Sequence, residues 1–200
     1  MHDIEPYDQW RDRYISSEDD RSPFHGRMYD EFYFTQKVYN YFIHPQWDDF
    51  GSQTLYLKVL YADYDDGYAI IELIGEWNDC LYNDVMYLKR EVIDHMQAEG
   101  ISKFILVCEN VFNFHGEDDS YYEEWAEEVS EEDGWICCVN TFRHVAEEMQ
   151  STHLEHYVNF GEAFNDINWR PWKPKVFFKA IEKIINKQTK KIGQAIGDWD

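Results

Sequence analysis

The stretch from Tyr68 to Gly116 constrains the fold of this chain more than any other part of it. An apolar run, YAIIELI, is followed by a segment of helical periodicity that ends at Gly100, and then by a second apolar run, KFILV. Apolar residues recur in the helical segment at steps of three and four, on one face: Leu81, Val85, Leu88, Val92 and Met96. Two strands joined by one helix and short turns pair in parallel with a right-handed crossover. The stretch therefore predicts a βαβ unit with its helix packed on a sheet.

A β-hairpin is predicted immediately before this unit. Thr54–Asp63 reads as a strand, and the turn YDDG at Tyr64–Gly67 leads into the strand Tyr68–Ile74, with Gly75 as the next turn. Gly after Asp suits such a turn because it accepts a positive φ. An antiparallel hairpin that leads into a parallel βαβ unit makes a mixed sheet, so the predicted class is α/β.

Strands and helices continue to alternate after the central unit. Ser120 and Glu123 have the spacing of a capping box, which predicts Ser120 as the N-cap of the next helix. The remaining elements are predicted at these positions: helix 120–129, strand 135–140, helix 142–150, strand 156–160 and helix 174–187, with Val176 among the inward-facing residues.

The chain divides into four predicted parts. They are a flexible or loosely docked acidic arm at 1–22, an aromatic-rich extension packed on the core at 23–53, the α/β domain at 54–187 and a tail at 188–200. Trp10 is a candidate anchor for the arm, and the alternation of Tyr39, Tyr41 and Ile43 predicts a short strand in the extension.

The charge of the chain bears on its partners. It carries 40 acidic and 18 basic residues, a formal net charge of −22. This argues against binding to nucleic acid or an anionic membrane and is compatible with a basic protein partner.

No segment has the length and apolarity of a membrane helix, and the first residues do not predict a secretory signal. The cysteines lie mainly in apolar runs, which predicts reduced thiols in the cytoplasm.

The order of these elements resembles a known family. Gly75, the helix to Gly100, KFILV and the run N-x-F-x-F-H-G-x-D-D, with Trp125 in the next helix, are similar to the STAS domain of sulfate transporters and anti-sigma factor antagonists. The SpoIIAA-like branch is the most similar part of that family, over about residues 54–187. The resemblance implies a non-catalytic regulatory domain.

The same resemblance suggests a phosphorylation site. Some STAS domains are switched by phosphorylation of a Ser at the start of the helix after the central strand, and Ser120 occupies that place here. The family has its Asp-Ser directly after the strand among small residues, whereas Ser120 lies within GEDDSYYEE. Neighbouring carboxylates would repel a phosphate, and the capping box explains Ser120 without one.

Polar residues after the central strand form the first candidate site. His115, Glu117, Asp118 and Asp119 follow the strand at the edge where α/β sheets usually bind ligands. A His among carboxylates could bind a partner or ligand, or perform acid–base chemistry with a metal. The alternative is that the acids cap the next helix and His115 is a turn residue.

The second candidate site is the loop NWRPWKP. Trp169, Arg170 and Trp172 are residue types favoured in binding interfaces, unless both indoles close over one end of the sheet.

Two other groups are weaker candidates. Glu155 and His156 follow His153 at a spacing that no metalloprotease motif has, and in a strand the His side chains would diverge. Cys137 and His144 lack a third residue to orient them for nucleophilic chemistry. We therefore assign no catalytic residue, no metal ligand and no cofactor from the sequence.

Two functions remain open from the sequence. The first is a non-catalytic cytoplasmic regulatory or interaction module that binds a protein partner or a small ligand, with the ten carboxylates between Glu117 and Asp133 facing a basic partner. The second is a small metal-assisted hydrolase that uses His115 with Asp118 or Asp119. Self-association through the aromatic extension would make the protein a homo-oligomer.

Overall fold

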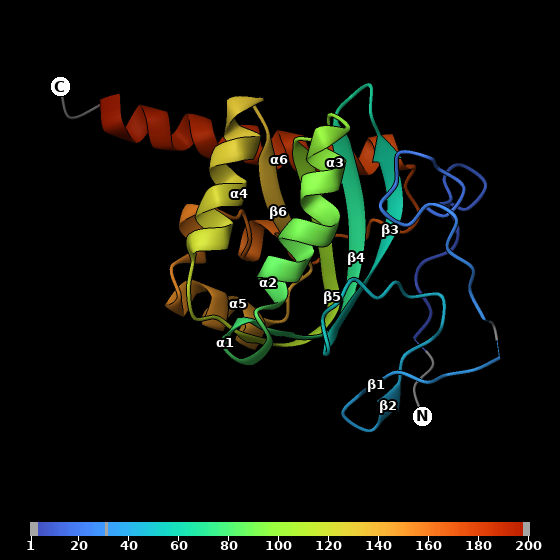
Figure 1. Ribbon diagram of the computed structural model, residues 1–200. Helices are drawn as coiled ribbons and strands as arrows, with labels where there is room; N and C mark the ends of the chain where they lie inside the picture. Colours follow the sequence, from blue (N-terminus) through green and yellow to red (C-terminus); the bar gives the residue numbers. More distant parts are fainter. Residues whose placement is uncertain (1–3, 31, 198–200) are drawn as a thin grey trace.

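A four-stranded mixed sheet forms the centre of the computed structural model, which describes residues 4–30 and 32–197, with side chains up to residue 189. The spatial order is β3–β4–β5–β6, with β3 antiparallel to β4 and the other neighbours parallel (Figure 1). The strands span Leu55–Asp63, Tyr68–Asn78, Lys103–His115 and Trp135–Val139. The predicted α/β class, the leading hairpin and the parallel βαβ unit are confirmed.

The hairpin forms at the predicted turn. Asp63 pairs with Tyr68 across it, and Gly67 has a φ of +67°. A left-handed residue at this position is what a tight turn between twisted strands requires. The turn sequence thus fixes the register of β3 against β4.

Both inner strands are longer than the sequence patterns predict. β4 passes through Gly75 to Asn78, and β5 continues eight residues beyond Val107 to His115. Gly75 is a bulge inside the strand, with a φ of +122°, and the β4–β5 register shifts beside it. The predicted turn at Gly75 is therefore wrong, because the Gly bends the strand without ending it.

The helix between β4 and β5 is not continuous. It consists of α1 (Asp79–Tyr82), α2 (Asp84–Tyr87), a π-helical turn (Leu88–Ile93) and α3 (Asp94–Ala98). Asn83 separates the first two with a left-handed φ of +52°. Leu81 consequently leaves the predicted apolar stripe and is 75% exposed, whereas the other four stripe residues are buried.

Helices α4 (Ser120–Glu131) and α5 (Arg143–Ser151) cover the same face of the sheet as α2 and α3 (Figure 1). The predicted cap of α4 is wrong by one residue. Asp119 is the N-cap, and the Asp118 carboxylate accepts a hydrogen bond from the Ser120 N–H at 2.8 Å. Ser120 is the first helical residue and its side chain is exposed.

Helix α6 (Pro174–Gly197) packs on the opposite face of the sheet (Figure 1). It extends ten residues beyond the predicted end at Lys187, into the predicted tail, of which residues 198–200 lie outside the described chain. Val176 is 53% exposed, so its predicted inward orientation is wrong, and the buried residues are Pro174, Phe177, Phe178, Ile181 and Ile185.

The N-terminal part of the chain lies against the domain. Residues 4–22, predicted as a flexible or loosely docked arm, include Trp10, which is 4% exposed and packs among Trp169 and Phe177 on the α6 face. Residues 1–3 lie outside the described chain. In the extension, the predicted strand is instead a small hairpin, β1 (Lys37–Val38) and β2 (Tyr41–Phe42).

The segment predicted as the strand 156–160 begins in a 3₁₀ turn, Leu154–His156, and makes one lone bridge from Asn159 to Cys137. Another 3₁₀ turn follows at Glu162–Phe164.

No helix among the described residues is both long and apolar enough to cross a membrane.

Candidate functional site

His115 is the last residue of β5 and lies beside the end of β4. Its Nε2 is 3.1 Å from Oε1 of Glu76, and about half of the His115 side chain is exposed. Glu117, two residues further on, is exposed and makes no ion pair with a side chain that the structure describes. His115 therefore pairs with a carboxylate of the sheet and not with the acidic loop that follows it.

The two aspartates of that loop have structural partners. Asp118 accepts the N–H of Ser120, which keeps the pKa of this carboxyl low. Oδ2 of Asp119 accepts a hydrogen bond from the Tyr157 hydroxyl at 3.0 Å. Among the described residues, the side chains of His115, Asp118 and Asp119 do not gather around one point where a metal ion could bind. The hydrolase arrangement considered from the sequence is thus not formed.

The tryptophan loop is largely internal. Trp169 is fully buried, and its Nε1 donates to Oε1 of Glu109 at 2.8 Å. Trp172 is half-buried, and its carbonyl accepts a hydrogen bond from Nε1 of Trp10. Trp169 is therefore not the exposed binding residue that the sequence suggests, because its indole closes the core of the α6 face. Arg170, with a side chain 47% exposed, is the most exposed of the three.

Arg170 joins two carboxylates that come from the middle of adjacent strands. Its Nη1 lies 2.5 Å from Oε2 of Glu109 on β5, and its Nη2 lies 3.8 Å from Oε1 of Glu72 on β4. Glu72 is 1% exposed and accepts the backbone N–H of Tyr7. Burial raises the pKa of Glu72 to about 7, although Tyr7 and Arg170 oppose the shift. Sequence reasoning missed this pair, since the one signal is a lone Glu inside YAIIELI.

The two predicted binding regions lie apart. His115 and Glu109 are six residues apart on β5, which is about 20 Å along an extended strand. The acidic loop and Arg170 therefore do not line one concave site.

The candidate nucleophile pair is also not formed. Cys137 is fully buried, whereas the ring of His144 is exposed and its Nε2 lies 2.7 Å from the carbonyl of Phe112.

An apolar groove lies between the β1–β2 hairpin and the projecting ends of β4 and β5. It has a volume of about 420 Å³ and is lined by Ile4, Val38, Tyr39, Tyr41, Phe42, Ile43, Ile74 and Phe112. We call it the hairpin groove. The Tyr39/Tyr41/Ile43 alternation marks this segment in the sequence, but nothing in the sequence shows that Ile74 and Phe112 complete the groove.

One hydrogen bond joins the hairpin to β5, and another joins the extension to the N-terminal segment that lines the groove. Nδ2 of Asn113 donates to the Tyr39 hydroxyl at 2.7 Å, and Nε1 of Trp47 donates to the Ile4 carbonyl at 2.7 Å. Tyr39 remains 56% exposed and has a left-handed φ of +53°. Glu76 lies beside it and adds to the effect of burial in raising the pKa of Tyr39. The groove is thus preformed, with an aromatic wall and a carboxylate at its edge.

The acidic helix α4 is partly neutralised within the fold. Arg90 forms a bidentate pair with Glu124, with distances of 2.7 and 2.8 Å, and this lowers the pKa of Glu124. The buried Lys89 contacts Glu128 at 2.6 Å. Eight carboxylates of the acidic run make no ion pair with a described side chain: Glu117, Asp118, Asp119, Glu123, Glu127, Glu131, Glu132 and Asp133.

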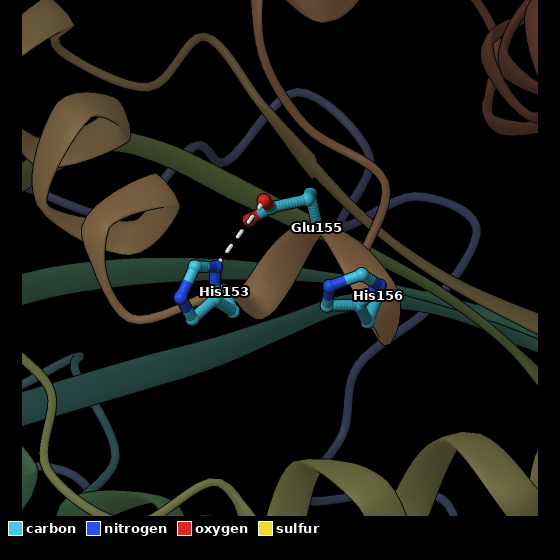
Figure 2. Close-up of side chains that lie close together, drawn as sticks. All are labelled: His153, Glu155 and His156. Carbon is cyan, nitrogen blue, oxygen red and sulfur yellow. Dashed lines mark ion pairs between the residues drawn. The ribbon is translucent and has the colours of Figure 1, made fainter.

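The turn after α5 brings three metal-ligating residues together, contrary to the divergence predicted for a strand. The ligand atoms of His153, Glu155 and His156 all lie within 4.8 Å of one another, and all three residues are exposed. Figure 2 shows the Glu155 carboxylate near one ring nitrogen of His153, with the His156 ring on the other side of the turn.

No family model and no curated protein matches the sequence. Two solved structures are similar to the chain. One is a candidate anti-sigma factor antagonist from Thermotoga maritima, 16% identical, covering 64% of this chain and 92% of its own, with a TM-score of 0.42. The other is SpoIIAA, a cell fate determinant of Bacillus in its phosphorylated form, 10% identical, covering 64% of this chain and 98% of its own, with a TM-score of 0.40. No residue role is carried over from either protein.

Proposed function

We propose that this protein is a non-catalytic regulatory or interaction module, and that its hairpin groove binds an apolar segment of a partner protein that also carries basic residues. The hairpin groove is the observation that supports this proposal. Its volume lies within the range of about 300–1,000 Å³ that is usual for binding pockets, and its lining is mainly aromatic and aliphatic. Exposed aromatic residues on a fixed backbone are the usual anchors of protein interfaces.

Charge supports the basic character of the partner. Glu76 lies at the edge of the hairpin groove, and the whole chain has a net charge of −22. Such a field accelerates the approach of a basic partner and repels acidic ones. The eight carboxylates of the acidic run that make no ion pair would add to this attraction. A cytoplasmic location, in keeping with four free cysteines, is part of this proposal.

Peptide selection tests the proposal directly. Random peptides displayed on phage are selected on the full chain, and the selected peptides are then measured by fluorescence anisotropy. We expect aromatic or aliphatic residues next to Lys or Arg in the selected sequences. Affinity should fall as NaCl is raised from about 0.05 to 0.5 M, because salt screens exposed charges.

Two matched variants locate the binding surface. Phe42→Glu places a charge in the hairpin groove, and Val176→Glu places the same charge on the exposed side of α6. We expect Phe42→Glu to weaken binding at least about tenfold and Val176→Glu to leave it within about twofold. Equal binding to both variants would contradict the proposal. Dimers in size-exclusion chromatography with light scattering that Phe42→Glu dissociates would assign the groove to a second copy of this chain instead.

The candidate phosphosite Ser120 stays a prediction. Its side chain is exposed, but its own N–H is already bonded to Asp118, whose carboxylate would repel a phosphate.

A further inference from the structure

The segment after α5, residues 153–156, is a 3₁₀ turn held by backbone hydrogen bonds. His153 has a φ of +60°, a left-handed conformation that ends the helix where Gly or Asn is usual. Its N–H bonds the carbonyl of Gln150, and its carbonyl accepts the N–H of His156. Leu154 is 1% exposed and anchors the turn in the core. The buried Leu154 and these backbone bonds hold the backbone of the turn in place, so the residues on either side of Leu154 project from fixed positions on the surface.

Those surface side chains form a donor set for a metal ion. Nδ1 of His153 lies 3.8 Å from Oε1 of Glu155, and the two His rings have centroids 6.1 Å apart. Figure 2 shows the His153 and His156 rings on either side of the turn, with the Glu155 carboxylate directed toward His153. Two imidazoles and one carboxylate are the ligands that a zinc site with open positions uses.

The distances permit coordination after small movements. Metal–ligand bonds of about 2.0–2.2 Å place tetrahedral ligand atoms roughly 3.3–3.6 Å apart. The observed separations of at most 4.8 Å must therefore shrink by about 1 Å. Exposed side chains achieve such a shift by small rotations about their χ angles. The backbone of the turn does not have to change.

The acidic loop after β5 lies close to this turn at two points, near Thr152 before the turn and at Tyr157 after it. A Cβ placed on Gly116 would lie 2.9 Å from Cγ2 of Thr152, the residue before His153. On the other side, the Tyr157 hydroxyl is bonded to Asp119. The carboxylates of the loop thus add negative potential near the three ligands, which favours a cation there.

We propose that His153, Glu155 and His156 bind one divalent transition-metal ion, with Zn²⁺ as the representative. Imidazole ligands favour zinc, copper and nickel over magnesium and calcium, which prefer oxygen alone. Water molecules occupy the remaining coordination positions. The site is distinct from the hairpin groove and does not depend on the function proposed for it.

Calorimetric titration of the full chain, without a histidine tag, with ZnCl₂ tests this inference. We expect saturable binding of one Zn²⁺ per chain and no comparable binding of Mg²⁺. Co²⁺ should give visible absorption bands that ZnCl₂ removes. Affinity should fall with acidification, since the imidazoles must be neutral to bind the metal. Absence of saturable Zn²⁺ binding overturns the inference.

Variants locate the ion. His153→Asn keeps a residue that tolerates a positive φ, and it is combined with His156→Asn. We expect each single change to weaken binding at least about tenfold and the pair to abolish it, with unchanged circular dichroism. His25→Asn, another exposed histidine, is the matched control and should leave binding unchanged.

The exposed thiol of Cys80 is the main competing ligand on the surface. Cys80→Ser should therefore retain Zn²⁺ binding. Loss of binding in Cys80→Ser or in His115→Asn, with binding kept in the His153/His156 pair, overturns the inference.

Discussion

At the scale of the residue, the most unusual group is the carboxyl of Glu72. It lies inside an apolar strand run with 1% exposure, and the Tyr7 N–H and the Arg170 guanidinium are its polar neighbours. Burial disfavours the charged form more than these neighbours favour it, so the pKa rises from 4.5 to about 7. A neutral carboxyl in the core costs less free energy than an ionised one, which makes the stability of the fold depend on pH between about 4.5 and 7.

Glu72→Gln should remove this pH dependence. The folded state holds the proton up to about pH 7, whereas the unfolded chain loses it near 4.5. The contribution of the neutral carboxyl is therefore complete below pH 4.5 and decreases as the pH rises to about 7. By 1.36 kcal/mol per pKa unit, the loss is of the order of 3 kcal/mol.

Urea denaturation at pH 5 and pH 8 measures this difference. We expect the free energy of unfolding of the parent to fall more between the two values than that of Glu72→Gln. Glu117→Gln, which removes an exposed carboxyl, should behave as the parent does. Parallel pH dependences for Glu72→Gln and the parent would show that Glu72 is ionised in the folded protein.

At the scale of the element, the bulge in β4 decides the shape of the sheet end. Gly75 has a φ of +122°, and a Cβ at this position would lie 2.1 Å from the carbonyl oxygen of Thr54. The strand continues past this point to Asn78, with Trp77 buried on the face that α2 to α5 cover. Ile74, just before the bulge, and Phe112 on β5 line the hairpin groove. The Gly lets β4 continue to Glu76, which pairs with Asn113, the residue that donates a hydrogen bond to Tyr39 at the groove.

Gly75→Ala should destabilise the protein by about 3–5 kcal/mol, because backbone strain and a steric clash add together. Gly161→Ala is the matched control, since Gly161 has a φ of +99° but no atom within 4 Å of an added Cβ. It should cost only the strain, about 1–2 kcal/mol. Chemical denaturation of the two variants compares them. Similar losses for both would mean that the contact with Thr54 relaxes without cost.

At the scale of the whole molecule, the N-terminal segment completes one face of the sheet. Trp10 packs against Trp169 and Phe177, and the Tyr7 backbone reaches Glu72, more than sixty residues away in the chain. Arg21 makes a further contact, with the carboxylate of Glu99 at 2.8 Å. The buried aromatic residues of the first fifty positions, Trp10, Phe24, Trp47 and Phe50, are therefore part of the core, while Tyr39, Tyr41 and Phe42 line the hairpin groove.

Trp10→Ala should destabilise the fold by about 3–5 kcal/mol, as expected for removing a buried large aromatic side chain. Tyr33→Ala removes an aromatic that is 73% exposed in the same part of the chain, and it should change stability by less than about 0.5 kcal/mol. The free energies of unfolding of both variants check this. A Trp10→Ala protein as stable as the parent would mean that residues 4–22 do not contribute to the core.

Much of the fold could be predicted because its signals are local. The hairpin turn at Gly67, the strand KFILV and the start of α6 at Pro174 each follow from a few neighbouring residues. The candidate sites could not be predicted in the same way. Trp169 is buried because residues from the N-terminal segment cover it, and His153 and His156 converge because the segment turns around the buried Leu154.

The sequence by itself determined the class, the order of the four sheet strands and the main helices, and the strong negative charge, because periodicity, turn residues and composition act locally or are independent of conformation. Tertiary structure alone decided which side chains meet. It placed Glu72 beside Arg170 and formed the ion pair between Glu124 and Arg90. It also placed Phe112 in the wall of the hairpin groove and brought the side chains of His153, Glu155 and His156 together. Such contacts join residues distant in the chain, or depend on a single left-handed residue, and no local pattern specifies them.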